Sequence, residues 1–113
     1  MELVVVDGTG ASKRLVLTGR LDAAGTEKVE VAFTAQIRAA QGPVLVDMTG
    51  VSFVGSLGIR MLIAAARVAD RAGGKVAIFG VQPAVAEVFS TIALDDLIPV
   101  LPDEAAARAQ IGA

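Results

Sequence analysis

Two apolar runs near the start of the chain are rich in the residue types that favour β-strands. These runs, "ELVVV" (2–6) and "KRLVLT" (13–18), flank the segment "DGTGAS" (7–12). An Asp-Gly pair followed by a second glycine suits the tight turn of a hairpin. We therefore expect the chain to open with two antiparallel strands.

The next segment has the apolar spacing of an amphipathic helix. Between residues 26 and 40 the apolar side chains recur at helical spacing, and Gly42-Pro43 ends the pattern; these side chains are Val29, Phe33, Ile37 and Ala40. Periodic apolar residues bounded by glycine and proline are typical of a helix that covers a core. This segment is predicted to be the first helix.

The second half of the chain reads as strands separated by helices. The runs "VLVDM" (44–48) and "KVAIFG" (75–80) are almost wholly apolar, as in strands covered on both faces. A helix starting near Ser56 joins them, and a short helix (84–91), an edge strand (97–101) and a helix after Pro102 follow. The pattern predicts the α/β class, with a mixed sheet of four to five strands (an N-terminal antiparallel hairpin, then parallel βαβ units) and about four helices.

The helix after Ser56 has apolar residues on two sides. One stripe suits the core, at about 100° per residue; it consists of Ile59, Leu62, Ile63, Ala66 and Ala69. The other side carries Leu57, Met61 and Val68, bordered by Arg60, Arg67 and Arg71. We expect this second side to face solvent and bind a partner, because Met and Arg are enriched at protein contacts. The alternative is an ordinary surface with scattered apolar residues.

Composition and charge exclude several classes of function. The 113 residues, of which 54% are hydrophobic, fit one domain over residues 1–113. The chain has no cysteine and no histidine, so we expect neither thiolate metal sites nor cofactors. A net charge of −2 without a basic stripe predicts no nucleic-acid binding. Glu2 and Asp7 interrupt the first apolar run, so we expect no membrane insertion and a cytoplasmic protein.

Three polar residues are expected at the carboxyl edge of the parallel strands, where α/β sheets place working residues. They are Asp22, Asp47 and Ser56. Each also has a structural explanation: Ser56 as a helix N-cap, Asp22 as a cap or turn residue, and Asp47 as a partner of loop amides. An enzyme would need Asp22 and Asp47 as a carboxylate pair, or "GTGASK" (8–13) as a phosphate loop. No helix follows that loop and the chain has no histidine, so a non-enzymatic protein is predicted.

Three segments resemble the STAS domains, a family named for sulfate transporters and anti-sigma factor antagonists. One of them, "GGKVAIFGVQPAVAEVFSTIALDDLIPV" (73–100), is similar to the family's fourth strand, its proline-started helix and a last short strand. "LTGRLDAAGTEKVEVAF" (17–33) is similar to the family's Gly-x-Leu-Asp corner and first helix. "VLVDMTGVSFVGSLGIRMLI" (44–63) is similar to its third strand, switch loop and second helix. The resemblance implies a STAS-like fold over nearly the whole chain.

The resemblance also implies a switch residue. In the stand-alone anti-sigma factor antagonists the loop usually reads Phe-x-Asp-Ser-(Ser/Thr)-Gly-Leu, and the serine after the aspartate is phosphorylated. Here "FVGSLGI" (53–59) places Ser56 at the phosphoacceptor position and Gly58 at the family glycine, while Gly55 replaces the aspartate and Leu57 the second hydroxyl residue. Asp22 matches the aspartate of the Leu-Asp corner.

By resemblance, the protein would be an anti-sigma factor antagonist that acts by partner switching. Unphosphorylated, it would bind an anti-sigma factor that is also a serine kinase; phosphorylation at Ser56 would release it, and a PP2C-type phosphatase is a possible second partner. The expected partner-binding residues are Asp22, Gly55, Ser56, Leu57, Gly58, Arg60, Met61 and Val68. The alternative is a STAS accessory subunit that binds the ATPase of an ABC-type lipid transporter, a role that does not need the Asp-Ser pair.

Overall fold

The strands and helices alternate along the chain in the predicted order. The structure is a computed structural model that describes residues 1–7 and 12–113. Its elements are β1 (Glu2–Asp7), β2 (Lys13–Leu21), α1 (Ala23–Ala39), β3 (Val44–Val54), α2 (Ser56–Arg71), β4 (Val76–Phe79), α3 (Pro83–Thr91), the 3-10 helix η1 (Leu94–Asp96), β5 (Val100–Leu101) and α4 (Glu104–Ile111).

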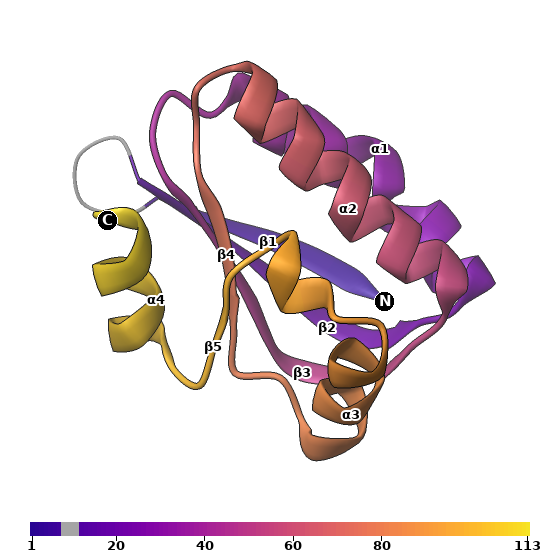
Figure 1. Ribbon diagram of the computed structural model, residues 1–113. Helices are drawn as coiled ribbons and strands as arrows, with labels where there is room; N and C mark the ends of the chain where they lie inside the picture. Colours follow the sequence, from indigo (N-terminus) through magenta and orange to yellow (C-terminus); the bar gives the residue numbers. More distant parts are fainter. Residues whose placement is uncertain (8–11) are drawn as a thin grey trace.

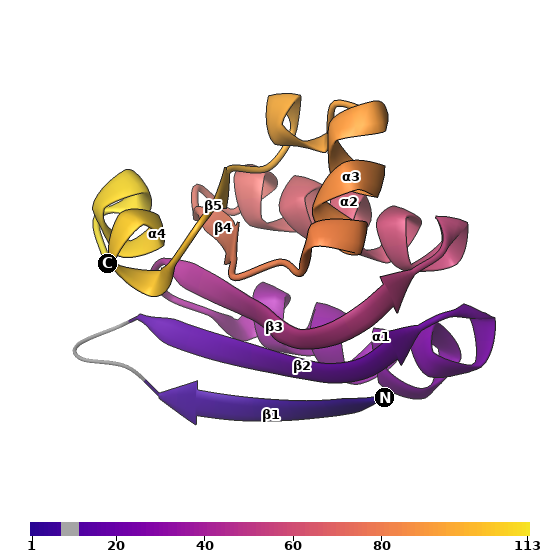
Figure 2. The same ribbon diagram turned by 90° about the horizontal axis from the view of Figure 1, so that it is seen from below.

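The sheet is mixed, as the sequence predicts. Among the described residues it has five strands in the order β1-β2-β3-β4-β5. β1 pairs antiparallel with β2, while the β2/β3, β3/β4 and β4/β5 pairs are parallel. Figure 2 shows β1 at the edge of the sheet, next to β2, with β3 on the other side of β2. The turn predicted at 7–12 lies mostly outside the described residues, so only the antiparallel pairing it implies is confirmed.

Strand β3 is longer than the sequence predicts. We expected a strand over 44–48 and a loop over 49–56, but β3 continues to Val54. Its second half pairs with the end of β2 through Arg20↔Phe53 and Leu21↔Val54, after irregularities in the register. The nine-residue strand β2 continues to Leu21 and keeps the second half of β3 in the sheet, where a loop was expected.

Helices cover both faces of the sheet. On one face the buried side chains of β2, β3 and β4 join those of α1, α2, α3 and η1 in the main core, which includes Leu15, Val46, Ile78, Phe33 and Phe89. The predicted core residues Val29, Phe33 and Ile37 of α1 are all buried, and Ala40 packs partly buried against the same cluster. On the other face Leu45, Ala77 and Phe79 pack with Ala107 and Ile111 of α4. Figure 1 shows α4 on the opposite side of the strands from α1 and α2.

Candidate functional site

Ser56 is the first residue of α2, and its side chain is exposed. The prediction that Ser56 is the N-cap is wrong, because the cap position falls on Gly55, in extended backbone with φ −99° and ψ −178°. Over residues 1–7 and 12–113 no hydrogen bond engages the Ser56 hydroxyl. The hydroxyl therefore has no structural task in the described chain and is open to another molecule.

The end of β2 holds the start of α2 in place. The Leu21 carbonyl accepts a hydrogen bond from the Gly55 N–H, with an N···O distance of 3.0 Å. A Cβ atom on Gly58 would lie 2.6 Å from Leu21 Cγ and 2.9 Å from the Leu21 carbonyl oxygen. Glycine at 58 thus permits a close approach that any side chain would block.

Asp22 follows Leu21 at this same corner. Its Oδ1 accepts a hydrogen bond from the Gly25 N–H at 2.8 Å and caps the N-terminus of α1. The structural explanation for Asp22 is therefore confirmed. Because the Leu21 carbonyl accepts a hydrogen bond from the Gly55 N–H, the neighbouring residue Asp22 lies near the start of α2. We expected Asp22 and Ser56 at the same edge of the sheet.

An aromatic and cationic pair that sequence reasoning missed lies beside this corner. The guanidinium carbon of Arg20 lies 4.5 Å from the centroid of the Phe53 ring, within the range of a cation–π contact. Arg20 Nε also lies 3.7 Å from Asp22 Oδ2. The sequence could have indicated the pair only through the β2/β3 register, and the expected loop over 49–56 hid that register.

Asp47 does not belong to this corner, contrary to prediction. It lies seven residues before Val54 in the extended strand β3, or roughly 20 Å at about 3.3 Å per residue. Its Oδ1 accepts hydrogen bonds from the Thr49 N–H at 2.9 Å and the Thr49 hydroxyl at 2.6 Å. The expectation that Asp47 shares one edge with Asp22 and Ser56 is therefore wrong, and Asp47 hydrogen-bonds within its own strand.

The predicted outward face of α2 is wrong for two of its three apolar residues. Met61 is buried, with 1% of its surface exposed, and Val68 packs partly buried against the core. Only Leu57 is exposed, at 41%. The reason lies in the elements that neighbour α2. One flank of α2, with Ile63, Ala66 and Arg67, borders a groove in front of η1. The opposite flank, with Met61 and Val68, faces α1, which packs alongside α2.

The core stripe of α2 is correspondingly rotated. Gly58, Met61, Leu62, Ala65 and Ala69 are buried, whereas the predicted core residues Ile59, Ile63 and Ala66 are only partly buried. The exposed side consists of Ser56, Leu57, Arg60, Ala64, Arg67 and Arg71, together with Asp70. We call Arg60, Arg67 and Arg71 the arginine ridge.

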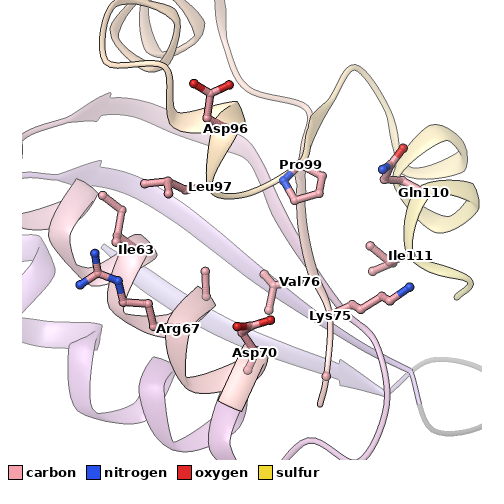
Figure 3. Close-up of a pocket in the computed structure, with 13 residues that line it drawn as sticks. Ile63, Arg67, Asp70, Lys75, Val76, Asp96, Leu97, Pro99, Gln110 and Ile111 are labelled. Carbon is pink, nitrogen blue, oxygen red and sulfur yellow. The ribbon is translucent and has the colours of Figure 1, made fainter. Parts of the chain in front are cut away.

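A groove opens on the flank of α2 away from α1. It has a volume of about 490 Å³ and is bordered by the second half of α2, the start of β4, the segment around η1 and the end of α4. Figure 3 shows Ile63 and Arg67 on one side, Leu97 and Asp96 on another, and Val76 and Lys75 toward the far end. No sequence signal predicted it, because its walls come from segments that are distant in the chain.

Neither a metal cluster nor a membrane span is found in the described part of the chain. Residues 1–7 and 12–113 contain no group of three or more acidic, histidine or cysteine side chains that could hold a metal ion. In the same part of the chain, no helix has the length and apolar character of a transmembrane span. The segment 8–13, which an enzyme would have needed as a phosphate loop, lies mostly outside the described residues.

Comparison with known families decides the assignment. The family model described as "Mlab, STAS domain" matches residues 4–101. The chain belongs to the STAS domain family. The resemblance found at the Leu-Asp corner and the switch loop is thereby confirmed.

Relatives of this STAS domain include proteins named as anti-sigma factor antagonists. One, BtrV of Bordetella bronchiseptica, is 26% identical over 93 residues, which cover 82% of this chain and 80% of BtrV. The structure of an anti-sigma-factor antagonist (STAS) domain protein from Planctomyces limnophilus superposes with a TM-score of 0.85 at 22% identity, over 98% of each chain. Bacillus SpoIIAA in its phosphorylated form gives a TM-score of 0.71 at 18% identity, over 97% of this chain and 99% of SpoIIAA. These structures share the fold, including the mixed sheet.

Proposed function

We propose that this STAS domain is a non-enzymatic regulator that acts as an anti-sigma factor antagonist by partner switching. In its unmodified form it binds an anti-sigma factor that is also a serine kinase. Phosphorylation of Ser56 by that kinase releases it, and a phosphatase of the PP2C type restores the binding form. Residues 1–113 act as a single STAS domain in this switch.

The observation that carries the proposal is the state of Ser56. Its hydroxyl is exposed at the N-terminus of a 16-residue helix and makes no hydrogen bond within the described chain. A kinase can therefore reach it without unfolding anything. The relationship to BtrV and the fold shared with SpoIIAA, which is known in a phosphorylated form, support the same role.

The proposed contact surface differs from the one expected from sequence. It keeps Gly55, Ser56, Leu57 and Arg60, and adds the stacked pair of Arg20 and Phe53 beside them. Asp22 and Gly58 hold this surface in position: Asp22 caps the N-terminus of α1, and Gly58 allows α2 to approach Leu21 closely. Met61 is left out because it is buried, and Val68 because it is already partly covered by packing against the core.

Charge explains how one phosphate can switch this surface without changing the fold. A phosphoserine carries about −1.5 to −2 charges, and the positive end of a helix dipole favours such a charge. The domain should therefore stay folded. Burying that charge in an interface with exposed Leu57 costs several kcal/mol, and about 4 kcal/mol weakens binding roughly a thousandfold.

The proposal is tested with Ser56→Asp and Ser56→Ala. We expect Ser56→Asp to melt within a few degrees of wild type but to lose binding to the cognate anti-sigma factor kinase in titration calorimetry, because the carboxylate mimics the phosphate charge. Ser56→Ala should bind like wild type. Ser90→Asp, the same change at an exposed serine of α3, is the matched control and should also bind. Tight binding by Ser56→Asp contradicts the switch.

A second candidate function has one observation in its favour. Gly55 stands at the N-cap of α2 and offers no side chain there, where the antagonists have an aspartate. A STAS accessory subunit that binds the ATPase of an ABC-type lipid transporter would need no such carboxylate. Incubation with ATP and the cognate kinase, followed by mass spectrometry, separates the two: phosphate on Ser56 supports the regulator, and an unmodified chain supports the subunit.

A further inference from the structure

The arginine ridge occupies the centre of the exposed side of α2. Arg60, Arg67 and Arg71 are spaced by seven and four residues, so at about 100° per residue they fall within roughly 40° of arc. Eleven residues of helix extend the ridge over about 16 Å. All three side chains are exposed. The chain therefore presents a straight line of three guanidinium groups to its surroundings.

These arginines have no carboxylate partner in the described part of the chain, in contrast to three others. Arg14 pairs with Glu104 at 3.2 Å, Arg108 with Glu104 at 2.7 Å, and Arg20 with Asp22 at 3.7 Å. Within residues 1–7 and 12–113 no ion pair within 4.0 Å involves the ridge. Among the described residues Arg38 of α1 is unpaired as well, so the ridge is distinguished by having three unpaired arginines on one side of a single helix.

The charge of the ridge is opposite to that of the rest of the molecule. α2 carries three arginines and one aspartate, whereas the chain as a whole has a net charge of −2. A short cationic line on an acidic protein suits a compact acidic surface, because an extended polyanion such as DNA would also meet the acidic remainder.

Apolar surface lies directly beside the ridge. Leu57 is exposed on the same side of the helix, and Arg67 also forms one wall of the groove with Ile63, across from Leu97, which is 57% exposed. Guanidinium groups next to apolar anchor sites are typical of protein–protein contacts. Asp70, Asp96 and Lys75 also line the groove, so it suits the uncharged side chains of an acidic partner and not its carboxylates.

We propose that the arginine ridge docks a carboxylate-rich surface of a protein partner, whose apolar side chains enter the adjoining groove. The inference rests on the proposed function and names the chemistry of that partner. It also extends the Ser56 switch, because Ser56 lies on the same side of α2, one turn before Arg60. A phosphate there offsets the positive charge of the ridge and repels the partner's carboxylates.

The experiment compares two double variants with the same change of charge. Arg60→Glu/Arg67→Glu reverses part of the ridge, and the matched control Lys28→Glu/Arg38→Glu reverses two exposed cations of α1. Both are first checked for wild-type unfolding midpoints. Binding is then measured over a range of salt concentrations to four probes: the purified cognate anti-sigma factor kinase, an amphipathic peptide with Glu and Leu at helical spacing, duplex DNA, and phosphatidylglycerol vesicles.

We expect the ridge variant to bind the kinase about tenfold or more weakly and with a flatter salt dependence, and the control to stay within about twofold of wild type. Equal binding by wild type and ridge variant overturns the inference but leaves the proposed function standing. Ridge-dependent binding of the peptide without binding of the kinase overturns the proposed function and supports the inference. Ridge-dependent binding of only DNA or vesicles, or of no probe, overturns the acidic protein partner.

Discussion

The switch loop of this chain keeps the serine of the family motif, Ser56, but has Gly55 where the motif has an aspartate. In the antagonists an aspartate precedes the phosphoacceptor serine, whereas here the N-cap of α2 is a glycine and the hydroxyl stands alone. Nothing in the backbone requires that glycine, because φ is −99°. A Cβ at position 55 would make only an ordinary contact, 3.4 Å from the Phe53 ring. The missing carboxylate is therefore a chemical difference from the antagonists and has no steric cause.

Restoring the carboxylate is expected to change modification more than stability. Aspartate is a preferred N-cap and glycine is only slightly worse, so Gly55→Asp should raise the free energy of unfolding by a few tenths of a kcal/mol. We expect phosphorylation of Ser56 by the cognate kinase to become faster, as followed by mass spectrometry over time. Gly55→Ala adds a side chain without the charge and should show no gain. Equal rates for the two variants would contradict a role for the carboxylate.

Helix α2 has four kinds of surface. Its buried stripe, with Leu62, Ala65 and Ala69, packs in the main core. One flank lies against α1, the opposite flank borders the groove before η1, and the outer side is solvent-exposed and carries the arginine ridge. An amphipathic pattern gives the presence of a helix, but it does not say which elements will lie on its flanks. This is why Met61 was expected outside and is found inside.

Met61→Glu is expected to lower the free energy of unfolding by about 3 to 5 kcal/mol, because it places an unpaired charge in a buried position between helices. Urea unfolding followed by circular dichroism measures this change. Arg60→Glu is the control at the adjacent exposed position and should stay within about 0.5 kcal/mol of wild type. A Met61→Glu protein as stable as wild type would show that this flank is not closed by α1.

The whole molecule depends on helices on both faces of one sheet. The main core contains most of the large buried side chains, such as Phe33 and Met48. The second face relies on α4, whose Ala107 and Ile111 pack with Leu45, Ala77 and Phe79. Arg14, Asp47, Glu104 and Arg108 form a chain of ion pairs between α4 and the sheet. Helix α4 is thus part of the fold, and it does not cover the exposed side of α2 that carries the arginine ridge.

Ile111→Ala tests the contribution of α4. Ile111 is 5% exposed, so its truncation should lower the free energy of unfolding by about 2 to 4 kcal/mol, through lost burial and a residual cavity. The measurement is again the urea midpoint with its slope. Leu97→Ala removes a similar volume at a position that is 57% exposed and should cost less than about 1 kcal/mol. Equal losses for the two variants would mean that α4 does not protect the second face.

Local spacing was enough to predict the order of elements, the antiparallel start, the parallel crossovers and the position of Ser56 at the beginning of a helix. These features depend on residues within one or two turns or one strand pair, and the motif "FVGSLGI" (53–59) supplied the family. The core positions of α1 followed in the same way, because Val29, Phe33 and Ile37 recur at helical spacing and are all buried, although Val31 of the same helix is 81% exposed.

The remaining features depend on which distant segments pack together. The burial of Met61 needed the neighbouring α1, the Arg20–Phe53 contact needed the β2/β3 register, and the separation of Asp47 from Asp22 needed the full length of β3. Burial and pairing are properties of neighbours in space, and residues far apart in the chain leave no periodic trace of their future contact. The free surface of α2 could therefore be recognised only after the helices around it had been placed.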